Sequence, residues 1–362
     1  LNDWLSKNVK GTKDKEIAKL LAEVESEQIK ELQDTNIRLL KRIDKLRSKK
    51  EQYVEALEVA VLDNFRNLSL PKITVPPHSK KRGAKEICVP ILSDVQLSKV
   101  TPTYNSEIAE QRVLLYADKI IKLARLHKAT TPVDKCVVLA VGDIIEGELI
   151  FPGQAHEIDS SLYRQVTVDG PRIFYNFFAK LLKEFKEVEV VWVIGNHGAL
   201  GGRSRRDYNP ETNADRMLGK ILETMFANEK RIKFVVPDGD KKKNWYKVVN
   251  LGKKCKILCF HGDNIRGSMG LPFYGYNKKV LGWKALASAG LMEDFTHAVC
   301  GHYHTPTSLY LNDVRLWVNG STESHNSYAQ EQLASMGRPS QFTLFVKPDK
   351  GVTAEYLVNL EE

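Results

Sequence analysis

The stretch VEVVWVIGNHG (Val188 to Gly198) decides the fold, because an apolar, β-branched run ends directly at a motif of Gly, Asn and His. Such a run predicts a buried strand. Four further motifs follow strand-like runs in the same way: SDVQ (Ser93 to Gln96), GDIIEG (Gly142 to Gly147), FHGD (Phe260 to Asp263) and GHYH (Gly301 to His304). Strand ends in an α/β fold meet at one edge of a sheet, so we expect the five motifs to build one site.

The five motifs share one donor chemistry. Each supplies Asp, Asn, Gln or His just after a strand-like run. Oxygen and imidazole donors together suit hard or borderline divalent cations such as manganese, iron or zinc. In GHYH, an extended backbone would point His302 and His304 to the same side, so that both rings address one pair of metals. A lone buried histidine is more often a core residue than a ligand, but five motifs in series are hard to obtain by chance.

This series resembles the calcineurin-like metallophosphoesterase family, whose pattern runs D-x-H, G-D-x-x, G-N-H-D/E, H and G-H-x-H. The resemblance covers roughly residues 87 to 325, and the GNH and GHYH motifs are its most specific parts. It implies a four-layer α-β-β-α sandwich and a two-metal centre that hydrolyses phosphoester bonds. Two cations roughly 3.5 to 4 Å apart can stabilise the attacking and the leaving oxygen of an in-line displacement.

The resemblance also implies a role for each motif residue. One metal would be held by Asp94, Gln96 and His304, and the other by Asn196, His261 and His302. Asp143 would bridge the two metals, and its carboxylate would offset their mutual repulsion. His197 would lie beside the scissile phosphate as the catalytic residue, where it can donate a proton or stabilise charge.

Two positions depart from the family pattern. Gln96 stands where the family usually has His, and an amide oxygen is a weaker, harder ligand than imidazole. We therefore expect the first metal position to be weaker and biased away from zinc, with two Mn²⁺ ions as the cofactors and Fe²⁺, Mg²⁺ or Zn²⁺ as alternatives. Gly198 stands where an acidic residue often follows GNH, so His197 is expected to lack an orienting partner and a raised pKa.

Changes in composition along the chain predict three regions. Residues 1–68 are charged and lack Pro, residues 69–86 read as a Pro-rich, basic linker, and residues 87–362 form the catalytic domain. Within this domain, amphipathic helices are expected at 107–127, 170–187, 213–228 and 278–290. Hairpins are expected around Asn312-Asp313 and around Asp349 to Gly351.

The first region carries a heptad pattern. One repeat position is occupied by Ile29, Asn36, Ile43, Lys50 and Leu57, and the other by Leu32, Leu39, Leu46, Tyr53 and Ala60. The pattern predicts a coiled coil, and a seam Asn such as Asn36 often fixes a two-stranded register. A homodimer through residues 29–60 is therefore expected. Docking onto the catalytic domain or onto a partner protein remains open.

Charge indicates the substrate. The formal net charge is +9, and most of it lies beyond residue 68. Arg203, Arg205 and Arg206 follow GNHG closely, and arginine side chains match phosphate oxygens. Such basic clusters suit a polyanion and predict nucleic acid as partner, with DNA favoured. Four aromatic residues after FHGD could stack unpaired bases or could be core: Phe273, Tyr274, Tyr276 and Trp283.

Composition favours a cytoplasmic, reducing compartment. The five cysteines are odd in number and lie mostly in strand-like runs, which indicates buried thiols. No apolar run of about 18 residues occurs, so no membrane span is expected. The start LNDWLSKNVK lacks the apolar segment of a signal peptide.

Three functions remain open at this stage. The first is a metal-dependent nuclease on DNA, because SDVQLSK and GNHG with its basic loop look like the DNA-repair exonuclease branch, which includes SbcD-type and related phage-encoded enzymes. The second is a phosphatase or phosphodiesterase for proteins or small molecules. The third is a non-catalytic scaffold that keeps the fold. Sequence does not name a partner ATPase, the polarity of cleavage, or endonuclease against exonuclease action.

Overall fold

The computed structural model describes residues 85–200, 210–237, 245–266, 271–324 and 337–361, together with residues 30, 33–39, 41, 42, 45, 73 and 74. The chain divides into two compact units, Leu1–Ala60 and Val61–Glu362. In the first unit the described residues 33–39 are helical. Most of the predicted heptad positions lie outside the described residues, so the coiled coil and the boundaries 1–68 and 69–86 stay predictions.

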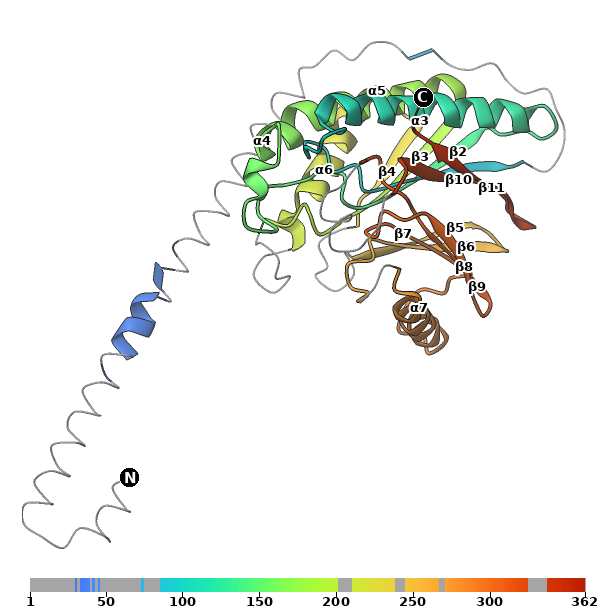
Figure 1. Cartoon of the computed structure of the whole chain (residues 1–362). Helices are drawn as coiled ribbons and strands as arrows, with labels where there is room; N and C mark the ends of the chain where they lie inside the picture. Colours follow the sequence, from blue (N-terminus) through green and yellow to red (C-terminus); the bar gives the residue numbers. More distant parts are fainter. Residues whose placement is uncertain are drawn as a thin grey trace, which may run out of the picture. The chain divides into compact units, whose positions relative to one another are not determined.

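Two sheets form the centre of the second unit (Figure 1). Within the described residues, the first sheet has six strands in the order β11-β10-β1-β2-β3-β4 and the second has five in the order β5-β6-β7-β9-β8. The first sheet contains β1 (Ile87–Leu92), β2 (Lys135–Val141), β3 (Glu187–Val193), β4 (Ile232–Val235), β10 (Ser340–Lys347) and β11 (Gly351–Asn359). The second contains β5 (Tyr246–Gly252), β6 (Cys255–Phe260), β7 (His297–Cys300), β8 (Thr307–Leu311) and β9 (Val314–Val318).

Parallel pairing brings the motifs to one edge. Strands β1, β2, β3 and β4 pair in parallel in the first sheet, and β6, β7 and β9 do so in the second. Parallel strands are usually covered on both faces, which explains why the runs read as almost continuously apolar. Their carboxyl ends point the same way within each sheet, so the polar motifs that follow them cluster.

The core between the sheets uses the two-residue alternation of each strand. Val137, Leu139 and Val141 of β2 pack in one apolar cluster with Ile257 and Cys259 of β6. The alternate side chains of β2 are buried as well, on the opposite face of the sheet. Both faces of the first sheet are therefore covered.

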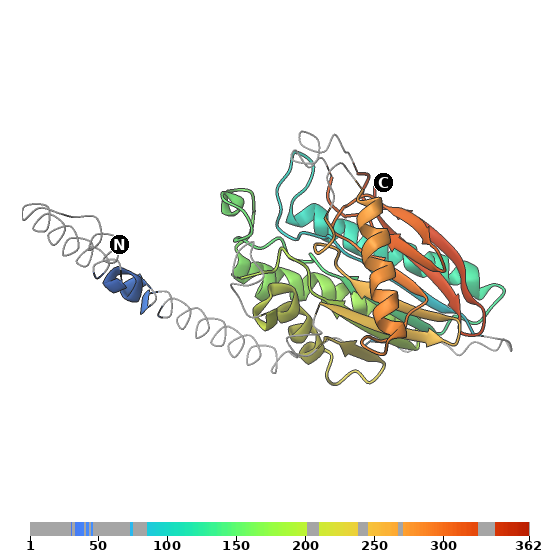
Figure 2. The same cartoon turned by 90° about the horizontal axis from the view of Figure 1, so that it is seen from below.

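Helices supply the outer layers (Figures 1 and 2). They are α3 (Ser106–Lys128), α5 (Gly170–Glu184) and α6 (Ala214–Met225) on the first sheet, and α7 (Phe273–Ser288) on the second. Asn105 begins α3, because its side chain accepts a hydrogen bond from the Ile108 amide at 2.9 Å. Helix α7 buries Tyr276, Val280 and Trp283 against the second sheet. The predicted four-layer α-β-β-α sandwich is confirmed.

The predicted elements match with a few differences. Helix α7 begins at Phe273 rather than at residue 278. The predicted hairpins are present as β8–β9 and β10–β11, where Asn312 and Gly351 adopt φ of 54° and 92°. Strands β4 and β5 were not predicted, nor were the short α4 (Leu162–Arg164) and the π-helical turn η2 (Gln165–Asp169), which lead into α5.

The five cysteines all lie in the described part of the chain and are buried free thiols, as the sequence predicts. Their burial raises the pKa of Cys255 to about 12 and keeps that thiol protonated at neutral pH. No helix among the described residues combines the length and the apolar character that crossing a membrane would require.

Candidate metal centre

The strand ends at the site bend sharply. Asp94, Asp143, His302 and His304 adopt φ of 52°, 51°, 74° and 53°, in the left-handed region that side chains other than glycine rarely occupy. Gln96 shares this conformation, with φ of 45°. Such backbone strain persists only where the surrounding structure fixes it, and it gathers at functional sites. The bend turns each side chain into the space between the strand ends.

Backbone hydrogen bonds join the motifs to one another. The Asp94 and Gln96 amides donate to the carbonyls of Gly142 and Asp143 at 3.1 and 2.9 Å. The Gly301 amide donates to the His261 carbonyl at 2.9 Å. Backbone hydrogen bonds alone therefore link SDVQ to GDIIEG and FHGD to GHYH.

Side-chain carboxylates complete the connection. The Asp94 Oδ1 atom accepts a hydrogen bond from the His302 amide at 2.9 Å, and the Asp143 Oδ1 atom accepts one from the His197 amide at 2.8 Å. A Cβ at Gly301 would collide with Asp94 Oδ2, and one at Gly195 would collide with Asp143 Oδ1. The glycines that open GHYH and GNHG are therefore required by the close approach of these carboxylates.

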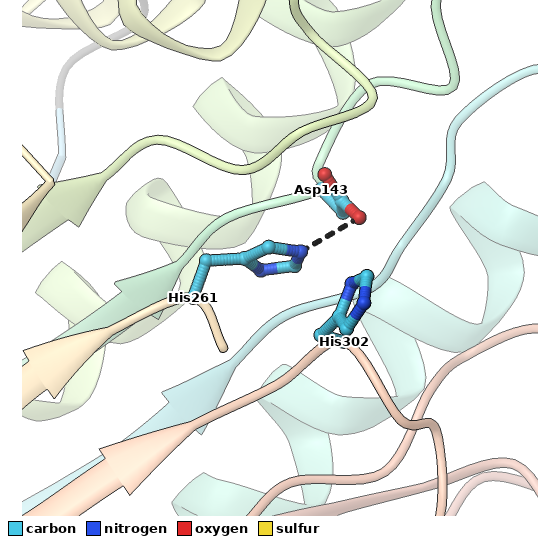
Figure 3. Close-up of side chains that lie close together, drawn as sticks. All are labelled: Asp143, His261 and His302. Carbon is cyan, nitrogen blue, oxygen red and sulfur yellow. Dashed lines mark ion pairs between the residues drawn. The ribbon is translucent and has the colours of Figure 1, made fainter. Parts of the chain in front are cut away.

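Asp143, His261 and His302 form a compact cluster at the ends of β2, β6 and β7 (Figure 3). Their ligand atoms lie within 4.8 Å of one another. His261 Nε2 is 2.8 Å from Asp143 Oδ2 and 3.1 Å from Asn196 Oδ1. His261 Nδ1 donates to the Val141 carbonyl at 2.9 Å, which fixes the ring and leaves Nε2 facing the cluster.

This geometry fits a cation. With the ring proton on Nδ1, His261 Nε2 and Asp143 Oδ2 face each other with lone pairs, so a proton or a metal ion must lie between them. Asp94 Oδ2 is buried and accepts no hydrogen bond from any described group, and the equally buried Asp143 Oδ2 faces the ring nitrogen of His261. Buried carboxylate oxygens without donors are costly unless they ligate a cation.

The pKa values show the same competition for positive charge. Burial disfavours the imidazolium of His261, but the Asp143 carboxylate outweighs burial and raises the pKa of His261 to about 10. The pKa of Asp143 is lowered in return, because His261 and His197 outweigh its burial. Burial and the neighbouring His261 lower the pKa of His302 to about 4, which leaves this ring neutral and free to ligate.

His197 does have an orienting partner, contrary to the expectation drawn from Gly198. Its Nδ1 atom lies 3.0 Å from Oε2 of Glu146, a fully buried residue of the GDIIEG motif. The other Glu146 oxygen accepts a hydrogen bond from Gln154 Nε2 at 3.0 Å. Burial lowers the pKa of His197, but Asp143 and Glu146 outweigh it and raise this pKa to about 9. Glu146 thus supplies, from another loop, the carboxylate that Gly198 cannot.

On the other side of the site, His304 and Asp94 face each other. His304 Nε2 lies 3.4 Å from Asp94 Oδ1, and His304 Nδ1 lies 3.2 Å from Oε2 of the buried Glu323. The two carboxylates outweigh burial and raise the pKa of His304 to about 10. Gln96 Nε2 lies 3.4 Å from both His304 Nε2 and His197 Nε2. Glu323 therefore orients His304 as Glu146 orients His197.

Asp215, which the sequence did not indicate, connects the GDIIEG and GNHG motifs through hydrogen bonds. Its Oδ1 atom accepts the Ile144 and Ile145 amides at 3.0 Å each, and its Oδ2 atom accepts the Asp143 and Gly195 amides at 2.9 Å each. Burial and the nearby Asp143 raise the pKa of Asp215 to about 6. Asp215 is the second residue of α6, and Asn213 caps this helix. An Asn-x-Asp pair ahead of an amphipathic helix signals only a cap in the sequence.

The structure thus brings together Asp94, Gln96, Asp143, Asn196, His197, His261, His302 and His304, from all five motifs. The predicted phosphate-binding residues Arg203, Arg205 and Arg206 lie outside the described residues. Of the four aromatic residues after FHGD, Phe273 and Tyr274 are exposed, whereas Tyr276 and Trp283 are core residues of α7.

A comparison with solved structures gave matches of low identity and low TM-score. One is Vacuolar Protein Sorting 29 from Cryptosporidium parvum, at 13% identity and a TM-score of 0.35, covering 76% of this chain and 99% of that chain. A conserved protein from Streptococcus pneumoniae, described as a predicted phosphoesterase, has 13% identity and a TM-score of 0.32, covering 76% and 99%. An archaeal phosphodiesterase has 12% identity and a TM-score of 0.33, covering 75% and 99%.

A comparison with curated protein sequences gave no match. A comparison with protein families matches residues 91–320 to the calcineurin-like phosphoesterases. This range begins in β1 and ends just after β9, so it holds the strands and loops that build the centre. The chain therefore belongs to the calcineurin-like phosphoesterase family.

Proposed function

We propose that this chain is a two-metal phosphodiester hydrolase and, more narrowly, a nuclease that acts on DNA. Family membership and the cluster of Asp143, His261 and His302 support metal-dependent phosphoester hydrolysis. The observation that carries the proposal is that His197, oriented by Glu146, lies at the edge of this cluster, with its Nε2 atom 4.0 Å from Asp143 Oδ2.

The donor sets fit two divalent cations. Asn196, His261 and His302 would hold one ion, Asp94 and His304 would hold the other, and Asp143 would contact both. Bound there, the cations would stabilise negative charge on the phosphate oxygens. The mixture of carboxylate, amide and imidazole donors suits Mn²⁺, with Fe²⁺, Mg²⁺ and Zn²⁺ as alternatives.

His197 would act as the general acid. The Glu146 carboxylate accepts a hydrogen bond from the Nδ1–H of the protonated ring, so that the second ring proton, on Nε2, faces the cluster. The raised pKa of about 9 keeps the imidazolium charged at neutral pH. Its Nε2 proton would move to the oxygen of the leaving group, and the Glu146 carboxylate would stabilise the charged ring until then.

The exposed side chains at the start of α7 favour nucleic acid over a small substrate. Phe273 and Tyr274 begin α7 and are 57% and 79% exposed, which is unusual for large aromatic side chains. Two exposed lysines, Lys278 and Lys279, lie in the next turn. Aromatic faces with nearby cations stack bases and neutralise phosphates.

Ring contacts connect α7 to the metal centre. The rings of Tyr276 and Tyr303 are 5.8 Å apart, and those of Tyr303 and His302 are 5.0 Å apart. Within the family, we propose the DNA-repair exonuclease branch, with its SbcD-type and phage-encoded enzymes. The SDVQLSK segment and the basic stretch after GNHG support that branch. A phosphatase or small-molecule phosphodiesterase is the second candidate, and a non-catalytic scaffold the third.

Hydrolysis assays decide among these functions. Labelled single-stranded DNA, double-stranded DNA and a generic phosphodiester would each be incubated with Mn²⁺, Mg²⁺ or Zn²⁺. A nuclease degrades DNA in Mn²⁺ far faster than the generic ester. Turnover of the generic ester alone would support the small-molecule function, and no turnover with any metal would support the scaffold.

We also propose that residues 29–60 pair with those of a second copy. Leu39, at a predicted seam position, is helical and 52% exposed within its own unit, so it is available to a partner helix. The second seam position described in the structure, Asn36, would fix the register of two strands.

A further inference from the structure

A buried lysine stands behind the first metal position. Lys99 has only 9% of its surface exposed, and its Nζ atom lies 3.1 Å from Oε1 of Glu323. The same Nζ donates a hydrogen bond to Gln96 Oε1 at 3.3 Å. Burial lowers the pKa of Lys99, but Glu323 and other carboxylates outweigh it and raise this pKa, so the ammonium stays charged.

The ammonium fixes which end of the Gln96 amide faces the centre. A lysine side chain has donors and no acceptor, so it must meet the amide oxygen and not the NH₂ group. The Gln96 nitrogen is therefore the atom that lies 3.4 Å from His197 Nε2 and from His304 Nε2. Amide nitrogens are donors and do not ligate metals.

We propose that Gln96 is no metal ligand, and that Lys99 holds its amide so that the NH₂ group faces the centre as a donor for a phosphate oxygen. This inference rests on the proposed function and revises the ligand role that the family resemblance implies for Gln96. The position of the family's histidine is thus filled by a group that recognises the substrate.

The two metal positions then become unequal. One retains four protein donors, from Asp143, Asn196, His261 and His302. The other retains three, from Asp94, Asp143 and His304. Lys99 lies beside the three-donor position, but Glu323 pairs with its ammonium at 3.1 Å, so the inequality rests on the number of donors. The four-donor position is therefore the tight one.

Titration of the metal-free, full-length chain with Mn²⁺ tests this, with free Mn²⁺ followed by its electron paramagnetic resonance signal. Wild type binds one tight ion and one weaker ion. Gln96→Ala leaves the weaker affinity within about twofold of wild type. That variant would lack a ligand if Gln96 bound the metal, and a drop of about tenfold or more in the weaker affinity would overturn the inference.

A double-mutant cycle separates amide orientation from charge. Lys99→Met frees the amide to turn its oxygen inward, so the weaker position tightens, and it tightens less when Gln96 is already Ala. Equal tightening in both backgrounds would show that only the charge of Lys99 matters and would overturn the orienting role. Lys99→Arg, which keeps a charged donor, is the matched control and retains the wild-type affinity.

Binding of inorganic phosphate to the Mn²⁺-loaded chain reports the donor directly. Gln96→Ala weakens it by about tenfold, the order expected for a hydrogen bond to a charged group. Unchanged phosphate affinity would overturn the donor role. Two equal Mn²⁺ affinities in wild type would remove this inference and leave the proposed function intact, whereas the absence of Mn²⁺ binding would remove both.

Discussion

Asp143 is the residue on which the described hydrogen bonds and ion pairs of the centre converge. One oxygen accepts the His197 amide, and the other faces the rings of His261 and His197. Asp143→Asn keeps the shape of the side chain and removes its charge. We expect hydrolysis to fall to background and the bound metal to fall below one ion per chain, because both positions share this carboxylate.

Elemental analysis of the purified variant and an assay with the best substrate check this. Circular dichroism serves as the control, because the fold should be unchanged. A variant that retains both its metal content and its activity would refute the placement of the metals at Asp143.

The pairing of His197 with Glu146 predicts a graded loss of rate. His197→Ala should keep the bound metal and lose about 10² to 10⁴-fold in kcat, the usual contribution of a general acid. Glu146→Gln should lose less, because an amide still accepts a hydrogen bond from Nδ1 but no longer stabilises the imidazolium. Steady-state kinetics at fixed Mn²⁺ measure both, and a larger loss in Glu146→Gln than in His197→Ala would contradict the assignment.

Among single residues, the motif residues that meet at the site could be predicted from the sequence. The carboxylates that orient the histidines of the site could not. Short motifs after apolar runs mark Asp94, Asp143 and His302 because the chain must bend there. Glu146 and Glu323 act across folded loops, and no local spacing connects them to the histidines they orient. The error about His197 arose because the orienting carboxylate was sought next to it in the chain.

At the scale of elements, β7 carries a pH-dependent contribution to stability. Its first residue, His297, stacks on Trp317 with ring centroids 5.6 Å apart, and burial together with Arg315 lowers the pKa of His297. The unfolded chain binds a proton there near pH 6.5, and the folded chain does so only at lower pH. The free energy of unfolding therefore decreases as the pH falls below about 6.5.

His297→Gln should remove this component. The difference in free energy of unfolding, wild type minus variant, should shrink as the pH is lowered from about 7.5 to 5.5, by at most about 1.4 kcal/mol per pH unit for one proton. Urea denaturation at several pH values measures it. A difference that is constant with pH would show that His297 titrates alike in both states.

The strands of the sheet centre and the amphipathic helices could be predicted because their apolar residues follow periods of two and of about 3.6. Strand β4 has four residues, and β5 mixes buried and exposed positions irregularly, so neither shows a clear period. The sequence did not predict the first turn of α7, because Phe273 and Tyr274 are apolar and yet exposed, so they do not fit the period of an amphipathic helix.

At the scale of the whole molecule, the N-terminal region sets the oligomeric state that we predict. Removal of residues 1–68 should leave a folded domain that binds metal and should convert a dimer into a monomer. Asn36→Leu in the full chain should strengthen association and loosen its stoichiometry. Sedimentation of the three proteins tests this, and equal stoichiometry with and without residues 1–68 would refute the coiled coil.

The excess positive charge predicts salt-dependent binding of DNA. Arg203, Arg205 and Arg206 changed together to Ala should weaken DNA binding and reduce the log–log salt slope by roughly 0.7 to 0.9 for each phosphate that the protein no longer neutralises. Hydrolysis of a small phosphodiester should change little. Lys119, Lys122 and Arg125 on α3, changed together to Ala, provide a control of equal charge. Equal weakening in both triple variants would indicate only a general effect of net charge.

The carboxylate of Asp215 has a consequence for how ions enter the centre. Four backbone amides from two loops converge on it, so the loops are tied to α6 before any ion arrives. Loading then requires little ordering of the chain, and most of the binding free energy remains available as affinity. Hydrogen exchange at the Ile144, Ile145 and Gly195 amides should accordingly be slow in the metal-free chain and nearly unchanged after loading, as expected for a preorganised site.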